Sequence, residues 1–409
     1  MNNLPRSAYI HIPFCHRRCF YCDFAVIPLG NKIESLQGNG SRTIKDYLDF
    51  LNKEILSIKH KSSLSTIYIG GGTPSILNPL QIKELIDLFK DNYGVDYGAE
   101  ITMEIDPASF NEDDLYGFIN AGINRFSLGA QSFNNQILEM AGRRHLCTDV
   151  ERSCIWLKQA FNAGLVKSWS FDLIRNLPGS GYEEWKEDLK KTLEFYPPHI
   201  SIYDLNIESG TVFKKLFALG KLILPSEDES YENTNLTNLI LKSSGYVRYE
   251  ISNYSLPGHH SRHNRVYWNG SGWWGFGQGS TSSPWGQKFT RPRISKDYKK
   301  WVIDQCEVKL DPSLMRKENL YKELDEKIML GMRLKEGINI YKLFKEQNWD
   351  KQTSEGYLNK LLEEWEQFLE TGILINKGER FFLSDPRGME LSNQVLISMF
   401  KWWDKINLD

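Results

Sequence analysis

The sequence predicts an α/β fold, in which a partial (β/α)6 barrel precedes a C-terminal α+β region. Up to about residue 240, short β-rich runs alternate with amphipathic helical stretches, the pattern of a parallel sheet with crossover helices. The chain has 409 residues, of which 41% are hydrophobic and 25% charged, so it can bury a large core without disulfides. These observations exclude a small disulfide-stapled fold and a mostly disordered chain.

Six short apolar segments, each bounded by Gly, Pro, Asn or Asp, are predicted as the parallel strands. They are Ser7–Ile12, Thr66–Gly70, Ala99–Ile105, Arg125–Leu128, Ser170–Ile174 and His199–Asp204. Apolar residues recur at three- and four-residue steps from Ile44 to Ile58, which predicts a helix packed on the sheet. Asn78 with Pro79, and Asn111 before three acidic residues, predict the N-caps of two later helices.

The chain changes character after residue 240, which predicts three units. Residues 1–240 form the barrel, and 241–310 form a region rich in Gly, Ser, Trp, His and Arg. Helical periodicity and a hairpin after Gly372 predict that residues 311–409 form an α+β, winged-helix-like accessory region. Gly275, Gly277 and Gly279 look like a dinucleotide fingerprint, but they lack a strand–turn–helix frame, so we reject that interpretation.

Charge and hydropathy restrict the partners and the location. Lys and Arg total 50 and Asp and Glu total 52, so the formal net charge of −2 provides no global basic field and we expect no nucleic-acid partner. No stretch approaches the roughly 18 apolar residues of a membrane span, and the start lacks the pattern of a secretory signal. We expect a cytoplasmic protein without a transmembrane segment, although peripheral contact with a membrane stays open.

Three of the six cysteines crowd into one C-x3-C-x2-C segment, formed by Cys15, Cys19 and Cys22. A disulfide framework would distribute its cysteines differently, so this group predicts a metal site. Soft thiolates select zinc or an iron–sulfur cluster, and three of them would leave one iron of a four-iron cluster open to another ligand. His16 would instead complete a Cys3His zinc site, although its place beside Cys15 strains a shared tetrahedral centre. The spacing alone leaves a cluster, zinc and plain thiols open.

This segment resembles the radical S-adenosylmethionine superfamily, in which three cysteines hold a [4Fe-4S] cluster whose open iron chelates S-adenosylmethionine. Tyr21 before Cys22 fits the superfamily. The stretch from Tyr9 to Cys15 (YIHIPFC) is similar to the branch that contains oxygen-independent coproporphyrinogen oxidases and HemW-type heme chaperones. The resemblance covers nearly all of the chain and weakens toward the C-terminus. It implies a TIM-like radical S-adenosylmethionine barrel with a [4Fe-4S] cluster and S-adenosylmethionine as cofactors.

A Gly-rich loop and several strand ends form the predicted cofactor site. Residues 70–75 (GGGTPS) lie between a strand and a helix, where glycine lets the backbone approach a ligand, although a simple tight turn would look the same. Polar residues at the carboxyl ends of barrel strands converge, although for each one alone a solvated strand end or a helix cap is the plainer interpretation. The resemblance implies that S-adenosylmethionine contacts Tyr9, Gly72, Thr73, Glu104, Gln131, Arg143 and Asp172.

A second motif, His-Asn-x-x-Tyr-Trp, runs from His263 to Trp268. It places an imidazole beside two aromatic rings that suit a macrocycle, although a hydrogen-bonded packing histidine is the plainer interpretation. The motif is intact, and in HemW-type proteins it is associated with heme binding. The resemblance therefore implies heme as a ligand and His263 as its iron ligand, with His259 and His260 as nearby alternatives.

Phe24 distinguishes between the two functions of this branch. The oxidases continue the cysteine motif as C-x3-C-x2-C-x-C, whereas Phe24 occupies the position of the last cysteine here. The resemblance thus implies a heme chaperone that delivers heme to acceptor apo-proteins such as respiratory cytochromes or oxidases, rather than an enzyme.

The alternative is a coproporphyrinogen III oxidase that uses radical chemistry to decarboxylate propionates, for which an electron donor would be needed. A radical RNA-modifying enzyme is disfavoured by the near-neutral charge of the chain. A simple electron-transfer protein would leave the GGGTPS loop without a use.

Overall fold

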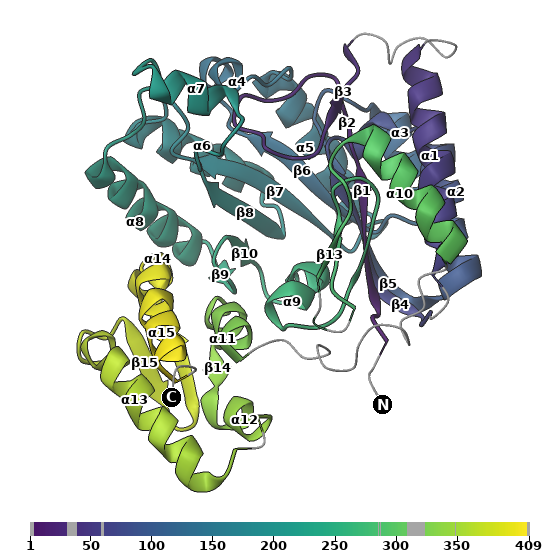
Figure 1. Ribbon diagram of the computed structural model, residues 1–409. Helices are drawn as coiled ribbons and strands as arrows, with labels where there is room; N and C mark the ends of the chain where they lie inside the picture. The colour runs from purple at the N-terminus through teal and green to yellow at the C-terminus, as the bar shows by residue number, and fades with distance from the viewer. Residues whose placement is uncertain are drawn as a thin grey trace.

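The computed structural model describes residues 4–30, 39–58, 61–284, 286, 288–308, 324–347 and 349–406 (Figure 1). A nine-stranded sheet forms the centre, in the order β11-β1-β4-β5-β6-β7-β8-β10-β9. Six neighbouring strands in it run parallel and match the six predicted segments, which confirms the predicted α/β fold. They are β1 (Ser7–Ile12), β4 (Leu64–Gly71), β5 (Val95–Ile105), β6 (Arg125–Gln131), β7 (Ser168–Arg175) and β8 (His199–Asp204).

The aromatic region after residue 240 adds strands to both edges of this sheet. β11 (Trp274–Phe276) runs parallel to β1, and β10 (Asn253–Ser255) runs antiparallel to β8 and to β9 (Val247–Arg248). These strands were not predicted, because two or three residues are too short to show a period of two. A separate two-stranded pair is formed by β12 (Thr281–Ser282) and β13 (Phe289–Thr290).

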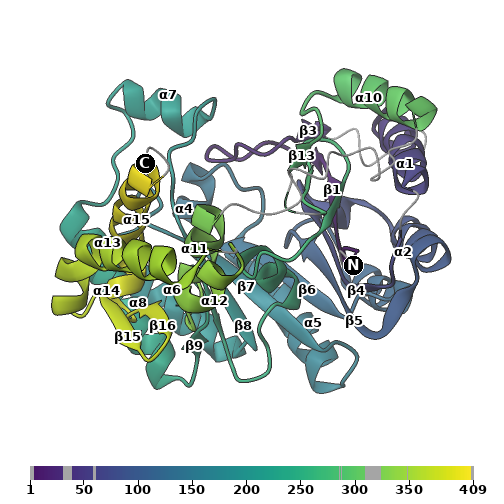
Figure 2. The ribbon, with the colours of Figure 1, turned by 60° about the horizontal axis from the view of Figure 1, so that its bottom comes forward.

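Helices of the crossover connections pack on the sheet, and Figure 2 shows α1, α2 and α10 together at one end of it. The predicted apolar face is buried in α1, and Asn78 and Asn111 are N-caps as predicted, each within a capping box. The longer helices are α1 (Asn39–Ser57), α2 (Pro79–Tyr93), α3 (Glu112–Ala121), α5 (Cys147–Asn162), α6 (Tyr182–Phe195), α8 (Glu227–Ser243) and α10 (Ser295–Val308). The shorter ones are the 3-10 turn η2 (Pro74–Ile76), α4 (Asn135–Met140), α7 (Val212–Ala218) and α9 (Arg262–Trp268).

One hydrophobic core joins the barrel to the aromatic region. Buried side chains of β11 and α10, including Trp274, Phe276 and Tyr298, belong to the same cluster as the interior of the sheet. Among the described residues, no helix has both the length and the apolar character needed to cross a membrane.

The C-terminal region builds a second core around Trp365, Phe381 and Trp402. Its three short strands pair antiparallel in the order β14-β16-β15, and the hairpin predicted after Gly372 is present. The winged-helix-like character of residues 311–409 and the boundaries at 240 and 310 stay predictions. The elements are α11 (Leu324–Met332), β14 (Ile338–Asn339), α12 (Ile340–Lys345), α13 (Lys351–Glu370), β15 (Leu374–Lys377), β16 (Arg380–Leu383), α14 (Arg387–Glu390) and α15 (Ser392–Ile406).

Candidate functional site

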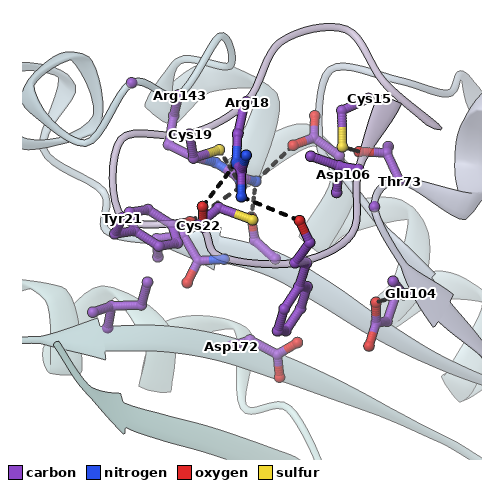
Figure 3. A pocket seen from close by; sticks show the side chains of 18 of the residues that line it. Cys15, Arg18, Cys19, Tyr21, Cys22, Thr73, Glu104, Asp106, Arg143 and Asp172 are labelled. Atoms are coloured by element: carbon purple, nitrogen blue, oxygen red, sulfur yellow. Dashed lines mark hydrogen bonds and ion pairs between the residues drawn. The ribbon is translucent and has the colours of Figure 1, made fainter. Parts of the chain in front are cut away.

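A cavity of about 420 Å³ opens at the carboxyl ends of the parallel strands (Figure 3). Because parallel strands end at one edge of a sheet, side chains far apart in sequence meet there. The predicted residues that line it are Cys15, Cys19, Cys22, Gly72, Thr73, Glu104, Gln131, Arg143 and Asp172. Two predicted residues, Tyr9 and His263, are not part of its lining.

The loop that carries the cysteines is closed at its base by β2 (Phe14–Cys15), which pairs in parallel with β3 (Ile27–Pro28). Two arginines hold the loop in place, since Arg17 donates to the carbonyl of Gly142 at 2.6 Å and Arg18 donates to that of Cys22 at 2.9 Å. These arginines were missed in the sequence, where their charges read as ordinary surface. The backbone turns back on itself, so that all three cysteines line one cavity.

Gly72 allows this loop to pack against the Gly-rich turn after β4. A Cβ at Gly72 would lie 2.6 Å from the carbonyl oxygen of Phe14 and 2.9 Å from Cys15 Sγ, so only glycine fits. The Thr73 hydroxyl donates to Cys15 Sγ at 3.6 Å. Burial raises the pKa of the Cys15 thiol to about 12, so this thiol is neutral until a metal displaces its proton.

Arg143 connects the cysteine loop to the end of β5. Its Nη1 lies 3.4 Å from Cys19 Sγ and 3.4 Å from the Tyr21 hydroxyl. Its Nη2 donates to Asp106 Oδ2 at 2.6 Å and to the carbonyl of Gly129 at 2.7 Å. Burial opposes ionisation of Asp106, but the Arg143 guanidinium prevails and holds the pKa of that carboxyl well below its usual range. Asp106 directly follows Ile105, the last residue of β5, and its position at a strand end is its only signal in the sequence.

Two further carboxyl groups line the cavity as hydrogen-bond acceptors. Glu104 accepts from the N–H of Gly71 and from the Tyr68 hydroxyl, both at 2.9 Å. Asp172 accepts from the hydroxyl groups of Ser127 at 2.7 Å and Ser170 at 2.8 Å. Burial raises the pKa of Glu104 to about 7 and also raises that of Asp172. These side chains suit the hydroxyl groups of a bound ligand, because burial makes their remaining lone pairs strong acceptors.

Gln131 is held in an unusual backbone conformation at the end of β6. Its φ of 70° is left-handed, and the register of β6 against β7 shifts between Gly129 and Gln131. Asp188 of α6 anchors the next two residues, accepting from the Ser132 hydroxyl at 2.8 Å and from the N–H of Phe133 at 2.7 Å. Such strain persists only where neighbouring contacts enforce it.

Tyr9 lies beneath the cavity wall rather than in it. Its ring stacks on Tyr68 with a centroid distance of 6.1 Å, and its hydroxyl lies 3.0 Å from His11 Nδ1. Tyr68 in turn lines the cavity and donates to Glu104. Tyr9 therefore supports the cavity wall by packing against the Tyr68 ring.

His263 lies outside the cavity lining, and its role as an iron ligand stays a prediction. Its side chain is 0% exposed and lies beside Thr66 of β4, with its ring centroid 5.2 Å from that of Tyr68, which lines the cavity. Its Nδ1 lies 2.8 Å from Thr66 Oγ1 and its Nε2 lies 2.8 Å from the Tyr267 hydroxyl. Because both ring nitrogens are occupied, His263 shows the hydrogen-bonded packing arrangement that the sequence also allowed.

Comparison with known proteins identifies the family. The model of the Radical SAM superfamily matches residues 9–192. The heme chaperone HemW of Synechocystis sp. is 36% identical over 97% of both chains, and that of Lactococcus lactis is 33% identical over 96% of both. The chain belongs to the HemW heme chaperone family. A similar solved structure is that of coproporphyrinogen III oxidase (HemN) from Escherichia coli, a radical SAM enzyme. The match covers 97% of this HemW-family chain and 90% of the oxidase, with a TM-score of 0.77 and 22% identity, so the two proteins share a fold.

Membership of the Radical SAM superfamily implies a [4Fe-4S] cluster and S-adenosylmethionine, and the cavity fits them. A zinc site would need thiolate sulfurs about 3.8 Å apart, given Zn–S bonds of about 2.3 Å. In the described part of the chain, no three His, Cys, Asp or Glu side chains are close enough to share one ion. The three cysteines still line one cavity, and a cluster binds each thiolate through a different iron. This donor set therefore fits a cluster.

Proposed function

We propose that this chain is a heme chaperone, which binds heme and transfers it to acceptor apo-proteins while carrying a [4Fe-4S] cluster and S-adenosylmethionine in its barrel. The observation that carries the proposal is the similarity to HemW heme chaperones along 97% of the chain. Phe24 adds support, because this residue lines the cavity with 55% of its surface exposed where the related oxidases carry a further cysteine.

The residues around the cavity divide into those that would hold the cluster and those that would hold S-adenosylmethionine. Cys15, Cys19 and Cys22 supply the three thiolates. Gly72 leaves backbone space beside them, and Thr73 orients the first of them through its hydroxyl. When bound, the cluster supplies one-electron reduction of a sulfonium.

The polar wall of the cavity holds the rest of the cofactor. Arg143 brings a positive charge toward the methionine carboxylate, while its Nη atoms keep their contacts with Asp106 and Cys19. Glu104 and Asp172 accept hydrogen bonds from ribose hydroxyls, and Gln131 is aimed by its left-handed backbone. Tyr9 supports this wall through its stacking on Tyr68.

The partners and the location follow from the same proposal. The acceptors are apo-proteins such as respiratory cytochromes or oxidases, and an electron donor is required only if S-adenosylmethionine is cleaved. Five cysteines are free of disulfides, which suits the reducing cytoplasm, namely Cys15, Cys19, Cys22, Cys147 and Cys154. Contact with a membrane would then be peripheral and would occur during transfer.

Heme titration into the anaerobically reconstituted protein tests this function. We expect a saturable Soret change at one heme per chain, followed by a shift of the spectrum when an apo-cytochrome is added. Iron and sulfide analysis of Cys19→Ala should show loss of the cluster, whereas Cys147→Ala, which lies outside the cavity lining, should retain it. Absence of saturable heme binding would contradict the proposal, and decarboxylation of coproporphyrinogen III would then favour the oxidase.

A further inference from the structure

A buried hydrogen-bond network joins Asp172, on the cavity wall in Figure 3, to Tyr249. Ser170, two residues earlier on β7, donates through its hydroxyl to Asp172 Oδ1 at 2.8 Å. The same Ser170 oxygen lies 2.8 Å from Nδ1 of His199, the first residue of β8. His199 Nε2 lies 2.8 Å from the hydroxyl of Tyr249, which directly follows β9. Ser170, His199 and Tyr249 are at most 1% exposed and do not line the cavity.

The donors of this network all point toward Asp172. A serine hydroxyl has one hydrogen, and Ser170 gives it to the carboxyl group, so Ser170 can only accept from His199. Burial and the nearby Arg125 guanidinium lower the pKa of His199 well below its usual range, so the ring is neutral. A neutral ring with its proton on Nδ1 has a bare Nε2, which accepts from the Tyr249 hydroxyl. The tautomer of His199 is therefore fixed by its partners on both sides.

Tyr249 is itself held in place by three other segments. Its hydroxyl accepts from the N–H of Ser261, the N-cap of α9, at 3.2 Å. Its ring stacks on that of His260 with a centroid distance of 4.3 Å. Its backbone carbonyl accepts from the N–H of Lys335, in the C-terminal region, at 3.0 Å. Because these contacts fix both the ring and the backbone, the Tyr249 hydroxyl keeps its direction toward His199.

Asp172 depends on these donors because it is a buried carboxyl group. Burial raises its pKa, and hydrogen bonds from neighbouring serine hydroxyls oppose that rise. Loss of the Tyr249 hydroxyl would remove the preference for one tautomer of His199. With the proton on Nε2, the bare Nδ1 would compete for the Ser170 hydrogen, and Asp172 would lose a donor. The carboxyl group would then be a less ordered and weaker acceptor toward the cavity.

We propose that Tyr249 is a positioning residue for S-adenosylmethionine, acting through His199 and Ser170 to hold Asp172 as an oriented acceptor for the ribose hydroxyl groups. The inference rests on the proposed function, in which Asp172 contacts that cofactor. The described residues that line the cavity all lie at or before Glu208. The inference therefore gives the region after residue 240 a part in cofactor binding, although that region does not reach the cavity.

The test is equilibrium dialysis of S-adenosylmethionine against the anaerobically reconstituted full chain, as wild type, Tyr249→Phe and Tyr246→Phe. Tyr246 is the matched control, because its hydroxyl is also buried but donates to the carbonyl of Pro197 at 2.5 Å, outside the network. We expect Tyr249→Phe to weaken binding by about three- to tenfold, the effect of one hydrogen bond. Tyr246→Phe should bind as the wild type does. Urea unfolding should show similar losses of stability in both variants, and iron and sulfide content should be unchanged.

A double-mutant cycle distinguishes positioning from a general loss of packing. Ser170→Ala already interrupts the network, so adding Tyr249→Phe to it should weaken binding no further. Additive losses in this double variant would overturn the inference, as would equal affinities of Tyr249→Phe and Tyr246→Phe. Asp172→Asn tests the assignment on which the inference rests, and we expect it to bind more weakly than the wild type. Unchanged binding by Asp172→Asn, or no binding by the wild type, would refute that assignment and the inference with it.

Discussion

At the scale of single residues, the cavity depends on backbone conformations that its neighbours enforce. Gln131 keeps its φ of 70° while Asp188 anchors the two residues that follow it. Gly72 lies so close to Phe14 and Cys15 that no side chain fits. Two predictions follow from these positions, one for an ionisable group and one for a glycine.

Because of Asp188, the free energy of unfolding should fall as the pH rises from about 4 to about 6. Burial raises the pKa of its carboxyl from 3.8 to about 6, so the folded state holds the proton more tightly than the unfolded state. The folded state is therefore favoured at low pH, and this advantage, on the order of 3 kcal/mol, is lost between the two pKa values. Urea unfolding of cofactor-free wild type and Asp188→Asn at several pH values measures it, because other groups cancel in the difference. Parallel curves for the two proteins would contradict the prediction.

Gly72→Ala should prevent assembly of the cluster. The new Cβ would meet the backbone oxygen of Phe14 at 2.6 Å, and backbone cannot move aside as a side chain can. We expect little iron or sulfide per chain after reconstitution, measured by chemical analysis. Gly356→Ala is the matched control, because nothing lies within 4 Å of its Cβ, and this change within α13 should stabilise the protein by about 0.5–1 kcal/mol. Normal cluster content in Gly72→Ala would contradict this role.

At the scale of elements, a buried carboxylate joins the aromatic region to the barrel. Glu54 of α1 accepts hydrogen bonds, each at 2.8 Å, from Arg291, from the N–H of Gly277 and from the Tyr298 hydroxyl. Gly277, in the Gly275–Gly279 run, is needed for close packing, since a Cβ there would also lie 2.4 Å from the Tyr47 hydroxyl. This explains why it resembles a dinucleotide fingerprint without the corresponding frame.

Glu54→Ala should destabilise the protein by about 3–5 kcal/mol, because it leaves the buried Arg291 guanidinium without its partner. Chemical denaturation of the reconstituted protein measures this free energy. Glu84→Ala on the exposed face of α2 is the control and should change stability by no more than about 0.5 kcal/mol. Equal effects of the two substitutions would show that Glu54 does not join these elements.

At the scale of the whole molecule, ion pairs connect the cavity wall to the C-terminal region, which lies beside the lower end of the barrel in Figure 1. Asp204 lines the cavity and accepts from Arg175 at 2.7 and 2.8 Å. Glu390 of α14 lies 2.6 Å from Arg248 and 3.5 Å from Arg175. Glu390 thus serves two arginines whose side chains are almost fully buried.

Glu390→Ala should loosen the C-terminal region, at a cost of about 2–3 kcal/mol, since two buried cations lose a partner across an interface. Hydrogen exchange should increase in β9 and α14, while β4 and β5 inside the barrel keep their protection. Glu366→Ala, on an exposed position of α13, is the control and should leave exchange unchanged. Equal hydrogen exchange of β9 and α14 in Glu390→Ala and in the control would contradict the role of Glu390 in holding the C-terminal region.

The sequence by itself determined the parallel core and most of the cavity. Six strands and two N-caps were predictable because period, turn residues and caps are local properties. The cysteines could be grouped from their spacing, and the strand-end residues could be expected to meet because parallel topology brings strand ends to one edge. Their roles toward the cofactor stay predictions. Only the tertiary structure decided the roles of residues whose partners are distant in sequence. The His263 ring hydrogen-bonds to Thr66, which lies 197 positions away, and no local pattern shows that contact.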